Sequence, residues 1–200
     1  MSKKGWFYII FFAVLFIVFY TVITMTTDIS KPKLPALNAV RPFRFLNQDG
    51  DTVSEKNVAG KVYLVEYFFT TCKGICPKMN HNMQELHDEM KSDDRFLILS
   101  HTVDPERDSV AALKHYADSL HAGENWWFLT GDKSSLYKTA RESYILDDPQ
   151  NSSKNISEQF LHTQLFALVD KDGMVRGIYD GLKKDDLALL REDIKTLLDQ

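Results

Sequence analysis

The two cysteines of the chain, Cys72 and Cys76, stand four positions apart and are its only cysteines. They follow an apolar run that predicts a buried strand and precede a segment with helical periodicity. A helix N-terminus presents unpaired backbone N–H groups and the positive end of the helix dipole, and both favour thiolate over thiol. If the turn between them is helical, residues four apart share one face, and both sulfurs can then face the same ion. Two soft sulfur ligands beside one small cation indicate a copper site.

A copper ion held by two thiolates needs a third ligand, and imidazole is the usual partner. The chain has six histidines. His101 and His162 each interrupt an apolar run, where a polar ring is either a satisfied core histidine or a ligand. The other four are interpreted as solvated surface histidines: His81, His87, His115 and His121.

Several residues near the thiols are interpreted as structural. Met79 and Met83 recur at the spacing of a buried helix face, so core packing is favoured over thioether ligation. In the segment Asp104–Ser109, carboxylates and a hydroxyl are suited to cap the next helix, with Pro105 at its first position. A structural disulfide between the two cysteines would close a very short loop and add little stability, so it explains the pair poorly.

The order of the predicted elements places the thiol motif after the first central strand of an α/β domain. Lys61–Phe69 predicts that strand, and a helical face runs from Cys76 to Met90. The other predicted elements are a hairpin turning at 49–50, strands over 96–103 and 126–130, helices over 110–120, 134–144 and 183–198, and a hairpin of 159–170 with 174–179. This order is typical of a thioredoxin-like fold with insertions. In such a sheet the chain after the loop 147–158 returns beside the thiols, which favours His162 as the third ligand.

The N-terminal segment predicts a single transmembrane helix. Residues 6–25 carry no charge, and this length matches the roughly 20 residues that a helix needs to cross the hydrocarbon core. A cleaved signal peptide would have a shorter apolar core and a small-residue cleavage site, which residues 20–28 lack. We therefore expect a short cytoplasmic tail over 1–5, an anchor over 6–25, a linker over 26–41 and an extracytoplasmic domain over 42–200.

The charge of the exported part bears on its partners. The 24 basic residues include Lys3 and Lys4 of the tail, so 22 basic residues face 28 acidic ones beyond the tail, a net charge of −6. An acidic domain argues against nucleic acid as a partner. About 170 residues beyond the anchor suffice for one domain.

Three blocks of the sequence occur together in one known family. They are Cys72–Pro77, Val103–Asp108, and His162 ahead of Phe166–Asp170. With these blocks in this order, the chain from Arg41 onward resembles the Sco/SenC proteins, which are membrane-anchored, thioredoxin-like copper proteins. The chain departs from many members in carrying Lys73–Gly74 where they place an acidic residue between the cysteines.

The resemblance implies a ligand set and a role. Cys72, Cys76 and His162 would bind copper as Cu(I) or Cu(II). The protein would assist assembly of the dinuclear copper centre, CuA, of cytochrome c oxidase, by delivering copper or by reducing the target's cysteines. Its partner would be subunit II of that oxidase or another exported copper protein. Because the N-terminus lacks the Arg- and Ser-rich character of a mitochondrial presequence, we expect a bacterial member in the inner (cytoplasmic) membrane.

The leading hypothesis is thus a copper-binding assembly factor and not a turnover enzyme. Copper binding and disulfide formation exclude each other here, because a disulfide supplies no thiolate. The alternative is a thiol–disulfide oxidoreductase that acts on exported proteins without delivering copper, and such a protein would not need His162. A peroxiredoxin-type peroxidase and a structural module with one disulfide rank third and last.

Overall fold

The structure is a computed structural model that describes residues 3–26, 34–150, 155–156, 159, 161 and 163–200. The chain divides into two units, residues 1–33 and 34–200. The first unit holds helix α1 (Lys3–Thr26), whose residues Lys4–Ile23 are long and apolar enough to cross a membrane. In the described part of the chain this is the one candidate span, and it coincides with the predicted anchor.

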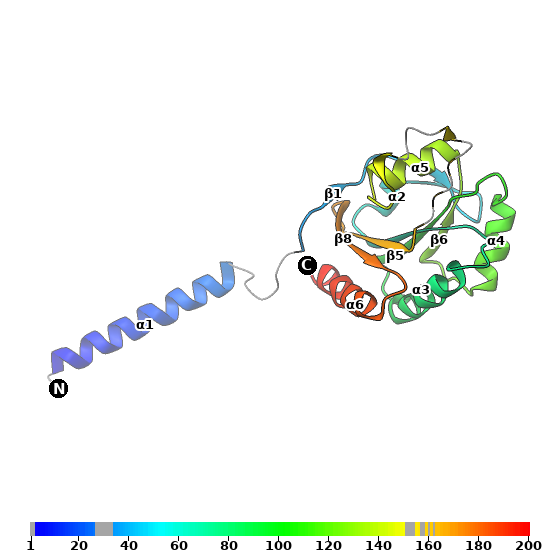
Figure 1. Ribbon diagram of the computed structural model, residues 1–200. Coiled ribbons are helices and arrows are strands. Elements are labelled where there is room, and N and C mark those ends of the chain that lie inside the picture. The colour runs from blue at the N-terminus through cyan, green and yellow to red at the C-terminus, as the bar shows by residue number, and fades with distance from the viewer. Residues whose placement is uncertain (1–2, 27–33, 151–154, 157–158, 160, 162) are drawn as a thin grey trace. The chain divides into compact units, whose positions relative to one another are not determined.

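The second unit is built on a six-stranded mixed sheet (Figure 1). Its strands, in spatial order, are β1 (Asn38–Ala39), β8 (Met174–Asp180), β7 (Leu165–Val169), β4 (Val62–Phe68), β5 (Phe96–Thr102) and β6 (Trp126–Leu129). The central strand β4 runs parallel to β5 and antiparallel to β7. A separate hairpin pairs β2 (Arg44–Leu46) with β3 (Thr52–Ser54), and Gly50 in its turn has a φ of 86°, which favours glycine.

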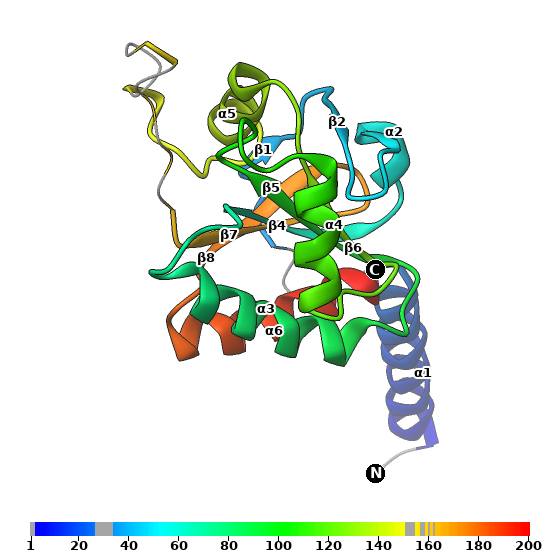
Figure 2. The same ribbon diagram turned by 90° about the vertical axis from the view of Figure 1, so that its right-hand side faces the viewer.

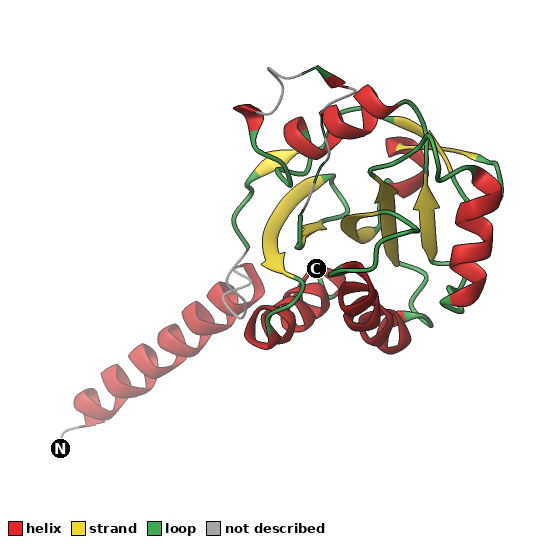
Figure 3. Ribbon diagram, turned by 45° about the vertical axis from the view of Figure 1, so that its right-hand side comes forward, coloured by secondary structure: helices red, strands yellow, loops and turns green. Residues whose placement is uncertain are grey.

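Helices cover both faces of this sheet. They are α2 (Glu55–Val58), α3 (Cys76–Met90), α4 (Val110–Ser119), α5 (Lys133–Glu142) and α6 (Lys184–Leu198). The β2–β3 hairpin, α2 and α5 lie on one side, and α3 and α6 lie on the other (Figure 2). Figure 3 shows two long helices side by side beneath the strands, and Arg191 of α6 joins them by pairing with Glu85 and Glu89 of α3.

Strand β4 is buried along its whole length because it separates two apolar cores. Leu64 and Phe68 point into the core beneath α3, α4 and α6, which we call the α3 core. Tyr63 and Val65 point into the core beneath α2 and α5, which we call the α5 core. Burial on both faces explains why this stretch of sequence is a nearly continuous apolar run.

The predicted α/β architecture is confirmed, with two differences in its boundaries. The folded unit begins at Leu34 and not after Arg41, because β1 pairs with β8 inside the predicted linker. A strand of two residues has no periodicity to detect. The predicted strand over 159–170 begins only at Leu165, although Leu161 is buried before it. In the sequence, an apolar residue that is buried in a loop looks like the first residue of a strand.

Candidate metal centre

The two thiols lie where β4 ends and α3 begins. Cys76 is the first residue of α3 and is buried, whereas Cys72 lies in the preceding turn and is half-buried. Both cysteines are free, as a site that binds metal through thiolates requires. The turn is closed by a hydrogen bond from the Cys72 N–H to the Phe69 carbonyl oxygen, at 3.2 Å. Cys76 lies at the helix N-terminus as predicted, but Cys72 precedes α3 by four residues, so the two thiols do not share one helix face.

The two thiols differ in acidity. Partial burial would raise the pKa of Cys72, but hydrogen bonds from the Cys76 thiol and from the N–H groups of Cys76, Gly74 and Ile75 outweigh it and lower the pKa. Burial raises the pKa of Cys76 to about 12, and its hydrogen bond to Cys72 and the nearby negative charge add to this shift. The pair therefore ionises at Cys72 first and keeps its proton on Cys76.

A mostly apolar groove of about 360 Å³ opens beside the thiols, and we call it the thiol groove. We call residues 70–76 the thiol turn, and the lining outside this turn is Tyr67, Phe68, Phe69, Val103, Leu161 and Thr163. Within the turn, Lys73 is the one charged side chain among the described lining residues. The apolar lining offers few polar groups that could compete with the sulfurs for a bound cation.

The predicted third ligand, His162, lies outside the described residues, so its role stays a prediction. Its neighbours Leu161 and Thr163 both line the thiol groove. Among the described residues, no three side chains of His, Cys, Asp or Glu gather closely enough to hold a metal ion. Two sulfurs suit a soft ion such as Cu(I), and they leave room for one further donor.

His101, the other candidate ligand, lies in the α5 core and is fully buried. Its ring stacks on Tyr67 at 5.0 Å and meets Phe43, Phe45 and Tyr144 edge-on or tilted. Burial lowers the pKa of His101 to about 3, so the ring is neutral. It packs among aromatic rings and does not line the thiol groove.

His87 does not match the prediction of a solvated surface histidine. The residue is 3% exposed, its Nε2 lies 2.9 Å from Asn125 Oδ1, and its ring packs near Trp126. The helix turns His87 toward the loop before β6, which covers it. The predicted core packing of Met79 and Met83 is confirmed, since both lie fully buried in the α3 core.

Asp108 fixes the start of the thiol turn, a role that its sequence context did not predict. Its buried carboxylate accepts hydrogen bonds from Thr70 N at 3.2 Å, from Thr70 Oγ1 at 2.5 Å and from Thr102 Oγ1. Of the predicted cap candidates, Ser109 caps α4 by accepting from Ala112 N, and the helix begins at Val110 and not at Pro105. Asp108 instead ties the turn that carries Cys72 to the end of β5.

Glu66 places a buried carboxyl group beneath the thiols. Its Oε1 accepts from Ser100 Oγ at 2.6 Å, and Ser100 Oγ accepts from Trp126 Nε1 at 2.8 Å. Burial raises the pKa of Glu66 to about 7 despite the Ser100 hydrogen bond. Its negative charge also raises the pKa of Cys76. A glutamate within an apolar strand was the signal in the sequence that could have found it.

Comparison with known proteins gives one family. The SCO1/SenC family model matches residues 32–199. A SCO1 protein homolog from Bacillus subtilis is 34% identical over 169 residues, which cover 82% of this chain and 85% of that protein.

Solved structures agree with this match. BsSco, described as a member of the Sco family of cytochrome c oxidase assembly proteins with a disulfide switch, is 34% identical with a TM-score of 0.68, covering 82% of this chain and 96% of BsSco. ScoI from Bradyrhizobium japonicum, solved with copper bound, is 26% identical with a TM-score of 0.63, covering 80% of this chain and 99% of ScoI. With its thioredoxin-like domain and paired thiols, the chain belongs to the SCO1/SenC family.

Proposed function

We propose that the protein binds one copper ion through Cys72 and Cys76, with His162 as the third ligand, and assists assembly of the CuA centre of cytochrome c oxidase. The observation that carries this proposal is the pair of free thiols at the N-terminus of α3, one of them with a lowered pKa. The position of Leu161 and Thr163 in the thiol groove supports His162, and copper-bound ScoI supports the metal.

Each residue has a distinct task in this proposal. Cys72, which is the more exposed and the more acidic thiol, meets the ion first. Cys76 then gives up its proton to the solvent as its sulfur binds, because the positive charge of the ion outweighs the cost of burying a thiolate. Asp108 keeps the turn in place so that both sulfurs face the same point.

Copper loading of the reduced protein tests the metal site. We expect one copper ion per chain in the wild type, and loss of tight binding in Cys72→Ser and in Cys76→Ser, because a hydroxyl is a poor ligand for Cu(I). Equal affinity in either serine variant would exclude the site. Oxidising the thiols to a disulfide before loading should block binding to the same degree.

A second candidate function is reduction of a partner's disulfide, and the unequal thiols favour it. The Cys72 thiolate would attack the partner's disulfide and form a mixed disulfide. Cys76, once deprotonated, would then attack Cys72 and release the partner as a dithiol. Two electrons pass to the partner, and this chain is left with a disulfide between Cys72 and Cys76.

His162→Ala separates the two functions. Losing one ligand of three should weaken copper binding severely while leaving both thiols able to exchange with a disulfide. A copper assembly factor would then fail to support oxidase maturation, whereas a thiol reductase would still support it. Thermal melting of the variant is the control for folding. Wild-type copper affinity in a normally folded variant would remove His162 from the ligand set.

We further propose that α1 anchors the domain in the bacterial cytoplasmic membrane with residues 34–200 on the extracytoplasmic side. Its apolar span and the lysines on its short N-terminal side support this orientation. Protease added to the outer face of spheroplasts should cut the exposed stretch Pro149–Gln150. Cleavage only after lysis would reverse the orientation.

A further inference from the structure

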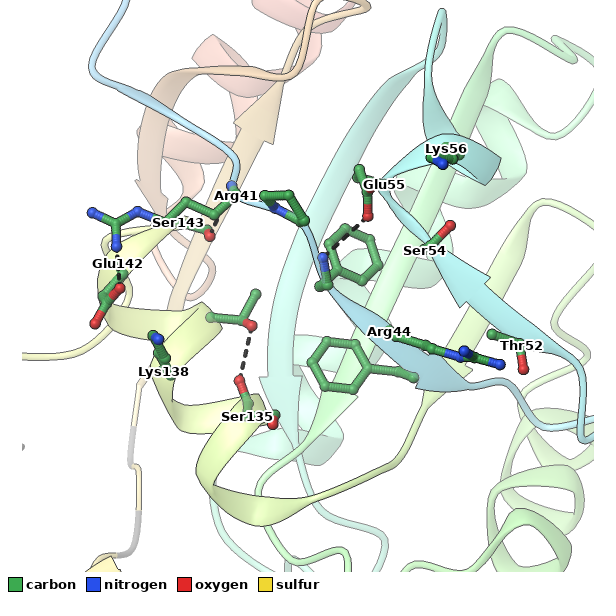
Figure 4. A pocket seen from close by; sticks show the side chains of 14 residues that line it. Arg41, Arg44, Thr52, Ser54, Glu55, Lys56, Ser135, Lys138, Glu142 and Ser143 are labelled. Carbon is green, nitrogen blue, oxygen red and sulfur yellow. Dashed lines mark hydrogen bonds and ion pairs between the residues drawn. The ribbon is translucent and has the colours of Figure 1, made fainter.

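An open groove of about 790 Å³ lies between the β2–β3 hairpin and α5, and we call it the basic groove (Figure 4). The rings of Phe43 and Phe45, stacked at 5.5 Å, form its apolar base. Both rings belong to the α5 core. The basic groove and the thiol groove share no lining residue, so a ligand in one leaves the other accessible.

Four cations and two carboxylates line the basic groove, and both carboxylates are already engaged. Glu142 pairs with Arg41, and Glu55 Oε2 accepts a hydrogen bond from Phe43 N at 3.1 Å. The three remaining cations, which have no ion-pair or hydrogen-bond partner in the described part of the chain, are Arg44, Lys56 and Lys138.

These three cations surround the concave surface. Figure 4 shows Arg44 and Lys56 on the side of the hairpin and α2, and Lys138 on the side of α5. The chain beyond the tail has a net charge of −6. The unpaired positive cluster in the groove is therefore opposite in sign to the charge of the domain as a whole. The four cations outnumber the two carboxylates, so the lining carries a net charge of +2 that can attract an external anion.

We propose that the basic groove binds an extended acidic segment of a partner protein. The acidic side chains would pair with the cations on both sides, and the apolar base would contact the chain between them. Because the groove is open and has cations on both of its sides, a peptide chain lying in it can meet cations on either side. A membrane surface carries similar charge, but it is broad and does not reach the base of a groove, so an acidic peptide fits better.

Full-length reduced protein in a zwitterionic detergent allows a direct test. The probe is a short rhodamine-labelled peptide of alternating glutamate and valine, and the matched probe carries glutamine in place of glutamate. Lys56→Gln and Lys138→Gln remove one groove cation each. Lys171→Gln removes an exposed lysine from the β7–β8 turn and serves as the matched control.

We expect the acidic peptide to bind by fluorescence anisotropy and the glutamine peptide not to bind. Each groove variant should weaken binding about threefold and the double variant about tenfold, with larger effects at low salt, as for exposed charge pairs. The control variant should keep wild-type affinity. Equal weakening in Lys171→Gln and the groove variants would mean non-specific attraction, and it would overturn the proposal.

Lysine acetylation read by mass spectrometry locates the ligand independently. The acidic peptide should protect Lys56 and Lys138 from the reagent and leave Lys171 reactive. The same reaction in nanodiscs, with and without anionic phosphatidylglycerol, tests the membrane. Protection by anionic lipid without protection by the peptide would make the groove a lipid site and refute the proposal. Neither result depends on copper or on the thiols, so this test is separate from that of the proposed function.

Discussion

Asp108 connects two parts of the chain that are far apart in sequence, and the geometry of the thiol turn depends on it. Its carboxylate, which is 1% exposed, binds Thr70 ahead of Cys72 and Thr102 at the end of β5. Removing one partner of such a network leaves buried donors without an acceptor, which costs about 1–3 kcal/mol for each group.

We therefore expect Asp108→Ala to lower the free energy of unfolding by about 2–4 kcal/mol, on the scale of a broken buried network. Copper affinity should fall as well, because the turn loses its tie to β5. Denaturant unfolding and a copper competition assay would measure the two effects. Asp104→Asn is the control, since Asp104 pairs with exposed Arg107 and does not contact Thr70. Wild-type copper affinity in a folded Asp108→Ala would show that the turn keeps its shape unaided.

Glu66 gives the domain a specific dependence of stability on pH. Its pKa is raised from 4.5 to about 7 by burial, so the folded state favours the protonated carboxyl. The protonated Glu66 carboxyl contributes its full stabilisation of the folded domain below pH 4.5. This contribution is lost as the pH rises through about 7. In Glu66→Gln this loss is absent, because the amide has no proton to release.

Copper-free, reduced protein should show this difference in denaturant unfolding at pH 5 and pH 8. We expect Glu66→Gln to gain stability relative to the wild type at pH 8 but not at pH 5, by up to about 3 kcal/mol. A constant difference between the two proteins at both pH values would contradict the assignment.

At the scale of elements, the passage from β8 to α6 depends on a close contact at Gly181. A Cβ atom added there would lie 2.6–2.9 Å from three ring atoms of buried Phe166. A ring held in a packed core cannot move aside cheaply.

Gly181→Ala should therefore destabilise the domain by about 1–3 kcal/mol, the usual cost of overpacking. Thermal melting would measure it. Gly74→Ala is the matched control, because nothing lies within 4 Å of a Cβ at that position. A melting temperature unchanged in both variants would mean that the Phe166 ring relaxes without cost.

Elements with strong periodicity were predictable, and short or irregular ones were not. The alternation or continuity of apolar residues predicted β4, α3 and β5 almost to the residue. Strand β1 and helix α2 contain too few residues to show a period. The thiol pair was visible because its spacing is local. The bond between Asp108 and Thr70 spans 38 positions, and only the fold brings these residues together.

The whole molecule divides at Leu34, ahead of the predicted linker end at Arg41. Strand β1 lies between these two positions and binds β8 through Leu37 N to Val175 O at 2.8 Å and Val40 N to Gly173 O at 2.9 Å. Asn38 also donates to two carbonyl oxygens at the end of α5. The segment thus holds the sheet edge and α5 together.

A chain that starts at Leu34 should be soluble without detergent and more stable than one that starts at Arg41. The expected difference is about 2–4 kcal/mol, from several hydrogen bonds worth about 1 kcal/mol each. Denaturant unfolding of the two chains would measure it, with copper stoichiometry as the test of an intact site. Equal stability would place the start of the folded unit at Arg41, as the sequence suggested.

The raised pKa of Cys76 would make metal binding at the proposed site depend on pH. Cys76 holds its proton at every physiological pH, because its pKa is about 12. Each ion that binds both sulfurs must therefore expel at least one proton, and apparent affinity rises about tenfold for each proton per pH unit. A domain facing an acidified exterior would retain copper less tightly than the same domain at neutral pH.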